Sequence, residues 1–233
     1  MPADSVLRLR VVSYNIKGWS GDTAALRATV HSLAPDVLVL QEVLRWPDPR
    51  TWFIDLAARF GMARACGGLT ACGNAVLTST AVTVHGWRAV RYPLTVRDSP
   101  RAAILVRCSA RGVAFVTAGS HLSTDPDIRL RQAGILKDAV NAAGAPVVVG
   151  ADVNETSTGP AWGTIAGGLV DAAEETGQAD LPTFPTRNPV RRIDAIFVAP
   201  SLPVVGYQVP DTPQTRAASD HFPLLAEVAL PAA

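Results

Sequence analysis

Short runs of apolar residues recur along the chain and alternate with only a few stretches of helical periodicity. Apolar runs of this length, bounded by Gly and Pro, predict β-strands. Eight strands are expected, near residues 7–15, 36–42, 74–79, 101–108, 113–121, 146–152, 192–199 and 222–230. Continuous runs such as Val147-Val148-Val149 suit strands buried on both faces, as when two sheets stack and helices cover their outer faces. The pattern is therefore neither a doubly wound sheet nor all β.

Three segments have apolar residues at helical spacing and a residue that can begin or end a helix. They are residues 23–33 after Asp22, residues 51–60 before Gly61, and residues 126–141 after Asp125. An aspartate before the first turn accepts a hydrogen bond from a backbone N–H that has no helical partner. The apolar stripes consist of Leu26, Val30 and Leu33 in the first helix, and of Ile128, Ile135 and Ala139 in the third.

Polar residues able to bind a metal or move a proton follow the ends of these strands. They are Asn15, Gln41, Glu42, His121, Asp152 and Asn154, with Arg192-Ile193-Asp194 and the final cluster Ser219-Asp220-His221. Side chains at the ends of neighbouring strands are expected to meet on one rim of a rigid scaffold. There the carboxylates would be hard metal ligands, and the imidazoles would titrate near neutrality. Such a set can hydrolyse a phosphoester.

The composition bounds the class of protein. With 233 residues, 48% hydrophobic and 18% charged, the chain has enough apolar material for one domain over residues 1–233 and no sign of a boundary. The net charge of +1 argues weakly against tight, sequence-blind binding of nucleic acid. Two arginine clusters and a bound metal could still supply local positive charge. The clusters are Arg187, Arg191 and Arg192, and Arg88, Arg91, Arg97 and Arg101.

Three cysteines, Cys66, Cys72 and Cys108, are too few and too scattered for a disulfide framework or a zinc site. Free thiols are favoured over a bridge between Cys66 and Cys72. The chain shows no basic and apolar leader and no run long enough to span a membrane, so an intracellular, cytoplasmic protein is expected. No obligate protein partner is evident from the sequence.

Seven short motifs follow one another over nearly the whole chain. They are Ser13-Tyr14-Asn15-Ile16, Leu40-Gln41-Glu42-Val43, Gly73-Asn74-Ala75-Val76-Leu77, Ser120-His121-Leu122, Gly150-Ala151-Asp152-Val153-Asn154, Arg192-Ile193-Asp194-Ala195-Ile196-Phe197 and Ser219-Asp220-His221-Phe222-Pro223. Each motif alone is a weak signal, but seven in this order are very hard to obtain by accident. The string resembles the endonuclease/exonuclease/phosphatase superfamily, the deoxyribonuclease I-like phosphoesterases.

The resemblance implies a four-layered α/β sandwich, with two stacked mixed β-sheets flanked by helices. It also implies a Mg²⁺-dependent hydrolytic site on one rim, in which Mn²⁺ can substitute. Glu42 and Asp220 are the expected metal ligands, with Asn15 beside them, because anionic oxygens suit a Mg²⁺ ion that keeps most of its water. A solvated acid and a turn asparagine would be the simpler interpretation of either position alone, but their co-occurrence favours a site.

Asp194 and His221 are expected to form a pair. Asp194 lies inside a strand, where an unpaired carboxylate is costly, and His221 is the obvious partner. An aspartate fixes the ring orientation of a histidine and stabilises its protonated form. The resemblance implies that His221 contacts the scissile phosphate or transfers a proton. The alternative is a buried salt bridge that only ties the last strand to its neighbour.

The remaining site residues are assigned in the same way. If the strand persists, Asp152 and Asn154 point to one face, where the carboxylate can orient a water and the amide can donate to a phosphoryl oxygen. The resemblance places His121 on a non-bridging oxygen or the leaving group, and Asn74 near the phosphate. Arg101 is either an anion contact or a surface arginine that caps a strand. No counterpart is evident for the extra acidic residue that pairs with the first histidine in secreted deoxyribonucleases.

The substrate is left open, because family members split phosphodiesters of nucleic acids and lipids as well as phosphomonoesters. Trp19, Trp46, Trp87 and Trp162 could line a pocket or pack in a core. The short loops leave little room for the insertions that grip duplex DNA or a membrane. A phosphodiesterase with nuclease-like chemistry is preferred over a phosphomonoesterase of a small molecule or lipid. A catalytically idle binding protein is a second alternative. Loss of activity should have removed at least one of the central residues, but none is missing among Glu42, Asp152, Asp194, Asp220 and His221. A zinc hydrolase is a third rival, but the histidines lack metal-ligand spacing.

Overall fold

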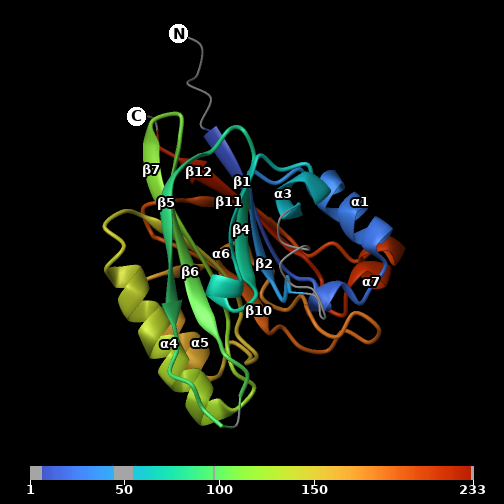
Figure 1. The fold of residues 1–233 in the computed structure, drawn as a ribbon, viewed down its shortest axis with the longest axis vertical. Coiled ribbons are helices and arrows are strands. Elements are labelled where there is room, and N and C mark those ends of the chain that lie inside the picture. Colours follow the sequence, from blue (N-terminus) through green and yellow to red (C-terminus); the bar gives the residue numbers. More distant parts are fainter. Residues whose placement is uncertain (1–6, 45–54, 97, 232–233) are drawn as a thin grey trace.

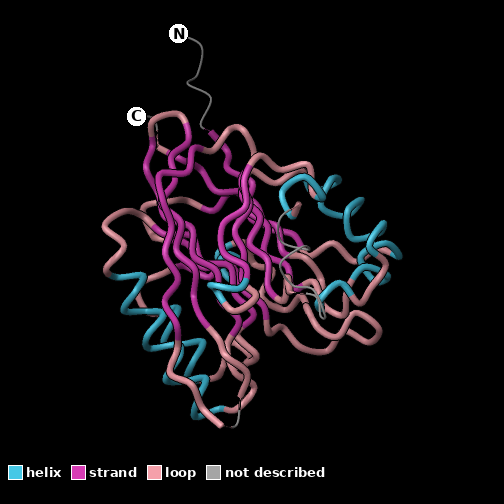
Figure 2. Tube along the Cα trace, viewed as in Figure 1, coloured by secondary structure: helices cyan, strands magenta, loops and turns pink. Residues whose placement is uncertain are grey.

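Two six-stranded β-sheets stack face to face at the centre of the computed structural model, which describes residues 7–44, 55–96 and 98–231. The strands form a central double layer, and helices flank it on both sides (Figure 2). Three apolar cores result, one between the sheets and one beneath the helices on each outer face. The fold is therefore the four-layered α/β sandwich with two stacked mixed sheets that the motifs imply.

The first sheet has the strand order β11-β12-β1-β2-β4-β3. Its strands are β1 (Leu7–Asn15), β2 (Val37–Gln41), β3 (Arg64–Gly68), β4 (Asn74–Thr78), β11 (Val204–Gln208) and β12 (Leu224–Leu230). Its outer face is covered by α1 (Thr23–Leu33), α3 (Leu56–Arg59) and α7 (Pro213–Ala218) (Figure 1). Asp22 caps α1 by accepting from the backbone N–H groups of Ala24 and Ala25, as predicted.

The second sheet has the strand order β5-β6-β7-β8-β10-β9. Its strands are β5 (Thr83–Arg91), β6 (Ala102–Ala110), β7 (Val113–His121), β8 (Val147–Asp152), β9 (Val170–Asp171) and β10 (Asp194–Val198). Its outer face packs against α4 (Pro126–Asn141) and α5 (Pro160–Ala166). The short elements η1 (Lys17–Trp19), η2 (Leu69–Ala71) and α6 (Ala172–Glu175) lie in the connections.

The two sheets repeat one topology. Each has a parallel pair joined by a long helix, β1-α1-β2 in the first and β7-α4-β8 in the second, with antiparallel strands on both sides. The strand order matches β1 with β7 and β2 with β8. Asn15 therefore corresponds to His121, because each ends the first strand of its parallel pair.

The sheets approach closely where the polar strand ends lie. Gly119 of β7 and Gly150 of β8 are neighbours in register, and both face Val39 of the first sheet. A Cβ atom at Gly150 would lie 3.0 Å from the Val39 Cβ and 2.9 Å from the Ser13 Oγ. Real side chains do not pack this tightly, so only glycine permits this spacing.

The eight predicted strands are present, but the sequence missed β3, β5, β9 and β11 and the short helices α5, α6 and α7. The expected helix over residues 51–60 is present only as α3, and residues 51–54 lie outside the described part. The stripe of α4 was placed wrongly. Its buried face is Arg129, Gln132, Ala133, Leu136, Ala139 and Val140, so Ile128 and Ile135 lie at its margin.

The cysteines and the membrane criterion agree with the simpler expectations. Cys66, Cys72 and Cys108 are free thiols, and no disulfide joins Cys66 to Cys72. Within the described residues, no helix combines the length and the apolar character needed to cross a membrane.

Candidate functional site

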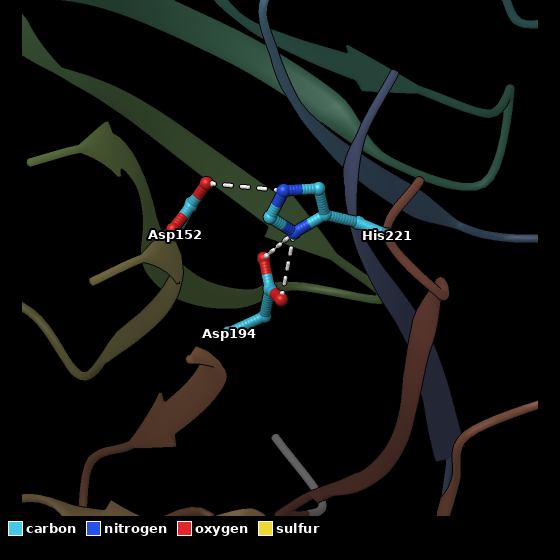
Figure 3. Close-up of side chains that lie close together, drawn as sticks. All are labelled: Asp152, Asp194 and His221. Atoms are coloured by element: carbon cyan, nitrogen blue, oxygen red, sulfur yellow. Dashed lines mark hydrogen bonds and ion pairs between the residues drawn. The ribbon is translucent and has the colours of Figure 1, made fainter. Parts of the chain in front are cut away.

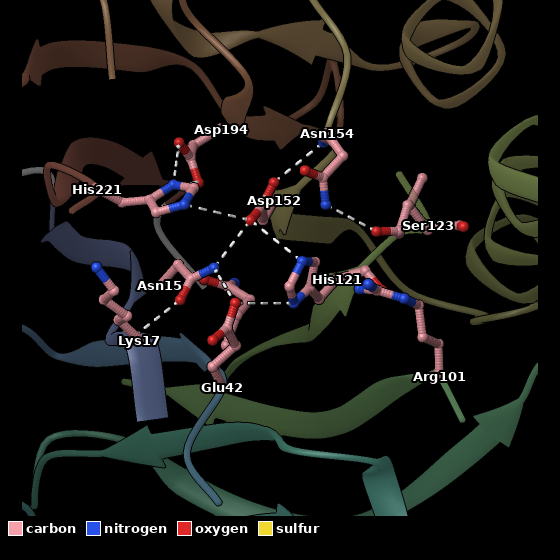
Figure 4. A network of polar contacts seen from close by, with 12 residues as sticks. Asn15, Lys17, Glu42, Arg101, His121, Ser123, Asp152, Asn154, Asp194 and His221 are labelled. Atoms are coloured by element: carbon pink, nitrogen blue, oxygen red, sulfur yellow. Dashed lines mark hydrogen bonds and ion pairs between the residues drawn. The ribbon is translucent and has the colours of Figure 1, made fainter. Parts of the chain in front are cut away.

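Polar side chains from both sheets gather on one rim of the sandwich, among them Asn15, Glu42, His121, Asp152, Asp194 and His221 (Figure 4). Asn15 ends β1 and Glu42 follows β2, while His121 ends β7, Asp152 ends β8 and Asp194 begins β10. Asp220 and His221 lie in the segment between α7 and β12. The strand ends therefore lie together on one rim, as the sequence predicts.

His221 lies between two buried aspartates (Figure 3). Its Nδ1 lies 3.0 Å from Asp194 Oδ2 and 3.1 Å from Asp194 Oδ1, and its Nε2 lies 3.8 Å from Asp152 Oδ2. Thr183 Oγ1 donates to Asp194 Oδ2 at 2.6 Å and so fixes the carboxylate. The expected contact between Asp194 and His221 is present, and only one of the two ring nitrogens is within hydrogen-bond distance of a carboxylate.

The charge of His221 follows from these neighbours. Burial alone would lower the pKa of the imidazole, but the attraction and hydrogen bond of Asp194, with the negative charge of Asp152, raise it to about 9. At neutral pH the ring is thus an imidazolium that carries a proton on each nitrogen. Its Nε2–H is directed toward Asp152 across a gap longer than a hydrogen bond.

The Asp152 carboxylate contacts side chains from both sheets. Asn15 Nδ2 donates to Asp152 Oδ2 and to Glu42 Oε1, each at 2.9 Å, so one amide bridges a carboxylate of each sheet. His121 Nε2 lies 3.3 Å from Asp152 Oδ2, and its Nδ1 lies 3.7 Å from Glu42 Oε1. The acidic neighbours of His121 are therefore Glu42 and Asp152, where the sequence had shown no acidic counterpart.

The pKa values of His121 and His221 are shifted in opposite directions. Burial lowers the pKa of His121, and the nearby Arg101 guanidinium adds to this effect against the attraction of Asp152 and Glu42. Burial opposes ionisation of Asp152, but the two imidazoles and the donors from Asn15 and Asn154 outweigh it and hold its pKa below the usual range. A neutral and a protonated imidazole on either side of one carboxylate are a suitable set for proton transfer.

The premise for Asn154 was wrong. Strand β8 ends at Asp152, and Asn154 has a φ of 56°, so the two side chains do not share a strand face. The backbone N–H of Asn154 donates to Asp152 Oδ1 at 3.0 Å, and its side-chain Nδ2 donates to the Leu122 carbonyl at 2.9 Å. Asn154 therefore positions Asp152 and ties β8 to the segment after β7, and the second N–H of its amide is left to donate to another group.

Asn74 and Arg101 also use their donors within the chain. Asn74 is buried, and its Nδ2 donates to the carbonyls of Ala71 and Ala102, which joins β4 to the start of β6. Arg101 donates from Nε to Asp98 and from Nη1 to the His121 carbonyl at 3.3 Å. Asn74 thus has no free donor for a phosphate, whereas the Arg101 guanidinium still lines the rim beside His121.

The sequence missed Lys17, whose Nζ lies 3.0 Å from Asp220 Oδ2. Lys17, Gly18 and Trp19 form a left-handed turn with φ values of 49°, 56° and 63°. The Lys17 backbone N–H donates to Asn15 Oδ1 at 3.0 Å, which fixes the start of this turn. A signal was present, since Lys17 is one of two lysines among 21 basic residues and stands two positions after Asn15. Non-glycine residues in this conformation are strained and often functional.

Two groups of residues could hold a metal. Asp152, Asp194 and His221 offer atoms within 4.8 Å of one another, but Asp194 and the His221 ring already form a hydrogen-bonded pair. Glu42 and Asp220 suit a hydrated Mg²⁺ better, because both are oxygen donors with partly exposed side chains, 41% and 31% respectively. The donor chemistry of the Glu42 and Asp220 pair thus fits a hard cation.

Two cavities adjoin this centre. The Glu42 cavity, of about 380 Å³, is lined by Glu42, Arg101 and His121 among others. The Asp220 cavity, of about 610 Å³, is lined by Lys17, Asp220 and Arg187 among others. Residues of the site therefore line two separate spaces.

The arginine clusters of the sequence are split by the fold. Arg192 is buried, donates to Asp171 Oδ2 at 2.7 Å and lies over the Trp162 ring, so it is structural. Arg191 lies over the Phe184 ring, and Arg187 alone of this cluster lines a cavity at the site. Trp19 and Trp162 are core residues, Trp87 is exposed, and Trp46 and Arg97 lie outside the described residues.

The family model of the Endonuclease/Exonuclease/phosphatase family matches residues 12–221 of the chain. No curated protein matches the chain in sequence.

Solved structures share the fold at low sequence identity. An endonuclease/exonuclease/phosphatase from Bacteroides vulgatus has a TM-score of 0.80 at 20% identity, over 97% of this chain and 100% of that one. A mannosyl-6-phosphatase from Bacteroides thetaiotaomicron has a TM-score of 0.76 at 18% identity, over 95% and 100%. The human Nocturnin catalytic domain with a bound sulfate anion has a TM-score of 0.77 at 20% identity, over 97% and 96%. At these identities the likeness shows the fold alone.

Proposed function

The chain belongs to the endonuclease/exonuclease/phosphatase family, and from this membership we propose that it is a Mg²⁺-dependent hydrolase of phosphodiesters with nuclease-like chemistry. The observation that carries the proposal is the arrangement of His221, Asp152 and His121 on one rim. A protonated imidazole, a carboxylate and a neutral imidazole meet there, within 3.8 Å at each step. These are the groups needed to stabilise a phosphoryl oxygen, orient a water and move a proton.

His221 would bind a phosphoryl oxygen. Its Nε2–H points toward Asp152 Oδ2 at 3.8 Å, and an oxygen atom between the two groups would be within reach of both. Asp194 holds the ring through Nδ1 and keeps it charged, so negative charge that develops at phosphorus meets a fixed imidazolium. His221 would need no proton transfer to act in this way.

Asp152 would orient the attacking water. Its carboxylate is ionised at neutral pH and is held by Asn15 and by the backbone of Asn154, so its lone pairs have fixed directions. The neutral ring of His121, 3.3 Å from Asp152 Oδ2, can exchange a proton with the leaving group or the water. In-line attack requires this fixed geometry more than it requires a strong base.

Glu42 and Asp220, supported by Asn15, are the residues that would hold Mg²⁺, with Mn²⁺ able to replace it. A divalent ion bound there would neutralise negative charge on the phosphoryl group. Asn15 supports Glu42 directly through the 2.9 Å hydrogen bond from its Nδ2.

The cavities favour a diester over a monoester. A phosphodiester carries a substituent on each side of phosphorus, and the Glu42 and Asp220 cavities are two separate spaces lined by residues of the site. A monoester would use only one of them. Lys17 and Arg187 in the Asp220 cavity add positive charge where a neighbouring phosphate of a polymer would lie.

The test is a substrate panel with Mg²⁺. We expect hydrolysis of a small chromogenic phosphodiester and of single-stranded oligonucleotides, and much slower release of phosphate from a small monoester. Rapid phosphate release from monoesters without diester cleavage would replace the proposal with a phosphomonoesterase of a small molecule or lipid. Binding of these substrates without any hydrolysis would instead favour an idle binding protein of the same fold.

Lys17→Met is expected to tighten the binding of Mg²⁺ by roughly two- to fivefold, because the ammonium group competes with the ion for Asp220. This range corresponds to the modest energy of a partly exposed ion pair, with side chains 49% and 31% exposed. Titration calorimetry with Mg²⁺ measures the affinity directly. Lys137→Met is the matched control, since its Nζ donates to the Gly167 carbonyl far from Asp220. Unchanged or weaker affinity in Lys17→Met would mean that Asp220 is no metal ligand.

A further inference from the structure

The hairpin of β5 and β6 forms a basic edge of the second sheet, away from the catalytic rim. Strand β5 is the edge strand of the order β5-β6-β7-β8-β10-β9. The two strands carry His85, Arg88, Arg91 and Arg107 and no aspartate or glutamate. In a chain with a net charge of only +1, this is a local excess of positive charge.

A cavity of about 410 Å³ lies on this edge, beside the last turn of α4. This Trp87 cavity is lined by the aromatic side chain of Trp87, by Arg88 and Arg107, and by an apolar floor of Leu105, Val116, Ala142 and Ala143. Trp87 is 40% exposed, whereas Trp19 and Trp162 are buried. Strands β5 and β6 run beside α4 (Figure 1), and the residues of β5 are exposed or half-buried along its whole length. The cavity thus combines an accessible aromatic face with two cationic groups.

The two guanidinium groups of the Trp87 cavity have no partner among the residues that the structure describes. Neither Arg88 nor Arg107 makes a hydrogen bond or ion pair there, and both side chains are exposed. Arg129 and Arg192, by contrast, are paired with Glu155 and Asp171. The Arg107 guanidinium lies against Gly86, where a Cβ atom would come within 3.2 Å of its Nη2. The β-bulge between Val84 and Gly86 therefore leaves room for this side chain.

The basic edge leads back to the catalytic rim. Arg91 lies at the end of β5, four residues from Trp87, which is about 13 Å along a strand. It is paired in register with Ala102, the residue after Arg101, and Arg101 lines the Glu42 cavity together with His121. Positive groups are thus spaced from the Trp87 cavity to the reaction centre, as an extended polyanion would require and a small anion would not.

We infer that the Trp87 cavity and the adjoining edge of β5 are a binding site for single-stranded nucleic acid, outside the catalytic centre. Trp87 stacks on a base, Arg88 and Arg107 bind phosphates, and Arg91 directs the strand toward the Glu42 cavity. Exposed aromatic and basic side chains in alternation are the usual means of holding single strands without regard to sequence. The inference rests on the proposed nuclease-like function, for which it names the substrate class.

A simpler interpretation is that the arginines only protect the edge strand from pairing with another chain. Edge protection explains exposed charge, but it does not explain an exposed tryptophan beside an apolar cavity. The two interpretations differ in what the variants should lose. Edge protection predicts self-association after loss of the arginines, and the binding site predicts weaker binding of nucleic acid.

The experiment measures the affinity for a fluorescein-labelled single-stranded 12-nucleotide probe by anisotropy, over a series of salt concentrations. The His221→Ala chain with chelator is the background, so that the probe is not cleaved. Arg88→Ala/Arg107→Ala is expected to weaken binding about tenfold at low salt and to reduce the salt slope by about 1.4, as expected for two lost phosphate contacts. Trp87→Ala is expected to weaken binding roughly 5- to 150-fold without changing the slope. Trp87→Phe should restore most of that loss.

Arg27→Ala is the matched control, because Arg27 is an exposed arginine of α1, over the other sheet, without a partner among the described residues. Each substitution is also made in the active chain, where hydrolysis of the small diester should stay unchanged and so report correct folding and function. If the cavity variants bind the probe as Arg27→Ala does, the inference is wrong. If they only aggregate in light scattering, the arginines protect the edge. If the small diester is not hydrolysed by any chain but the binding losses appear, the proposed function fails and the binding site stands.

Discussion

His221→Ala is expected to lower turnover of a chromogenic phosphodiester by roughly 10²–10⁴-fold, the usual range for a positioned acid–base or charge-stabilising group. The imidazolium is held by Asp194 and points at the place where a phosphoryl oxygen would lie. The value of kcat should fall by a larger factor than KM changes. The reason is that the contact between His221 and the phosphoryl oxygen strengthens as negative charge develops in the transition state. Steady-state kinetics measure both. Differential scanning fluorimetry should show a folded chain with a lower melting temperature, because the substitution leaves the buried Asp194 carboxylate without its charged partner.

Asp194→Asn and the double variant test whether the two residues act as one unit. Asparagine keeps the shape of the side chain but removes the charge that keeps His221 protonated. The loss in the double variant should be much smaller than the product of the two single losses. His31→Ala is the matched control, since His31 is exposed on α1. Multiplicative losses, or a control that loses as much activity, would contradict the role of the pair.

Removal of divalent metal is expected to abolish hydrolysis, and Mg²⁺ or Mn²⁺ to restore it. The reason is the oxygen donor set of Glu42, Asp220 and Asn15. Glu42→Gln should weaken metal affinity by roughly tenfold or more, because the charge of the ligands sets the affinity of a hard-cation site. Titration calorimetry measures the affinity, and activity against metal concentration gives an independent value.

The stability of Glu42→Gln separates a metal ligand from a structural acid. Glu42 and Asp152 share one amide donor, so loss of one negative charge relieves repulsion and should leave the melting temperature unchanged or higher. Glu175→Gln, at an exposed position of α6, is the control. Activity that survives excess chelator, or a marked drop in the melting temperature of Glu42→Gln, would reject the assignment.

The sequence predicted the strands that bear the site because those strands are buried on both faces. β2 and β8 are buried at every position, which requires continuous apolar runs. The edge strand β5 was missed because its residues are only exposed or half-buried and include Gly86 and four charged or polar residues, Thr83, His85, Arg88 and Arg91. Strand β11 was missed for the same reason, since only Tyr207 of its residues is buried.

Within the site, the identities of the residues were easier to predict than their backbone conformations and the directions of their side chains. The order of motifs placed Asp194 next to His221, because both lie on rigid strand ends. The left-handed turn at Lys17 and the positive φ of Asn154 were not predictable, since neither residue type favours that conformation strongly enough to be read from one sequence. Arg187 and Arg192 lie in the same loop, but Arg192 is buried and Arg187 lines a cavity. The sequence does not show which of the two arginines enters the core.

The last strand of the fold pairs with the first. Strand β12 lies between β11 and β1, and Ser219 Oγ donates to the carbonyl of Asn15, 204 residues earlier in the chain. During synthesis on the ribosome, the whole second sheet emerges before residues 219–221 exist. A nascent chain that has already made His121, Asp152 and Asp194 still has no imidazolium to place beside them. The set of side chains around Asp152 is therefore complete only after β12 is released and inserted.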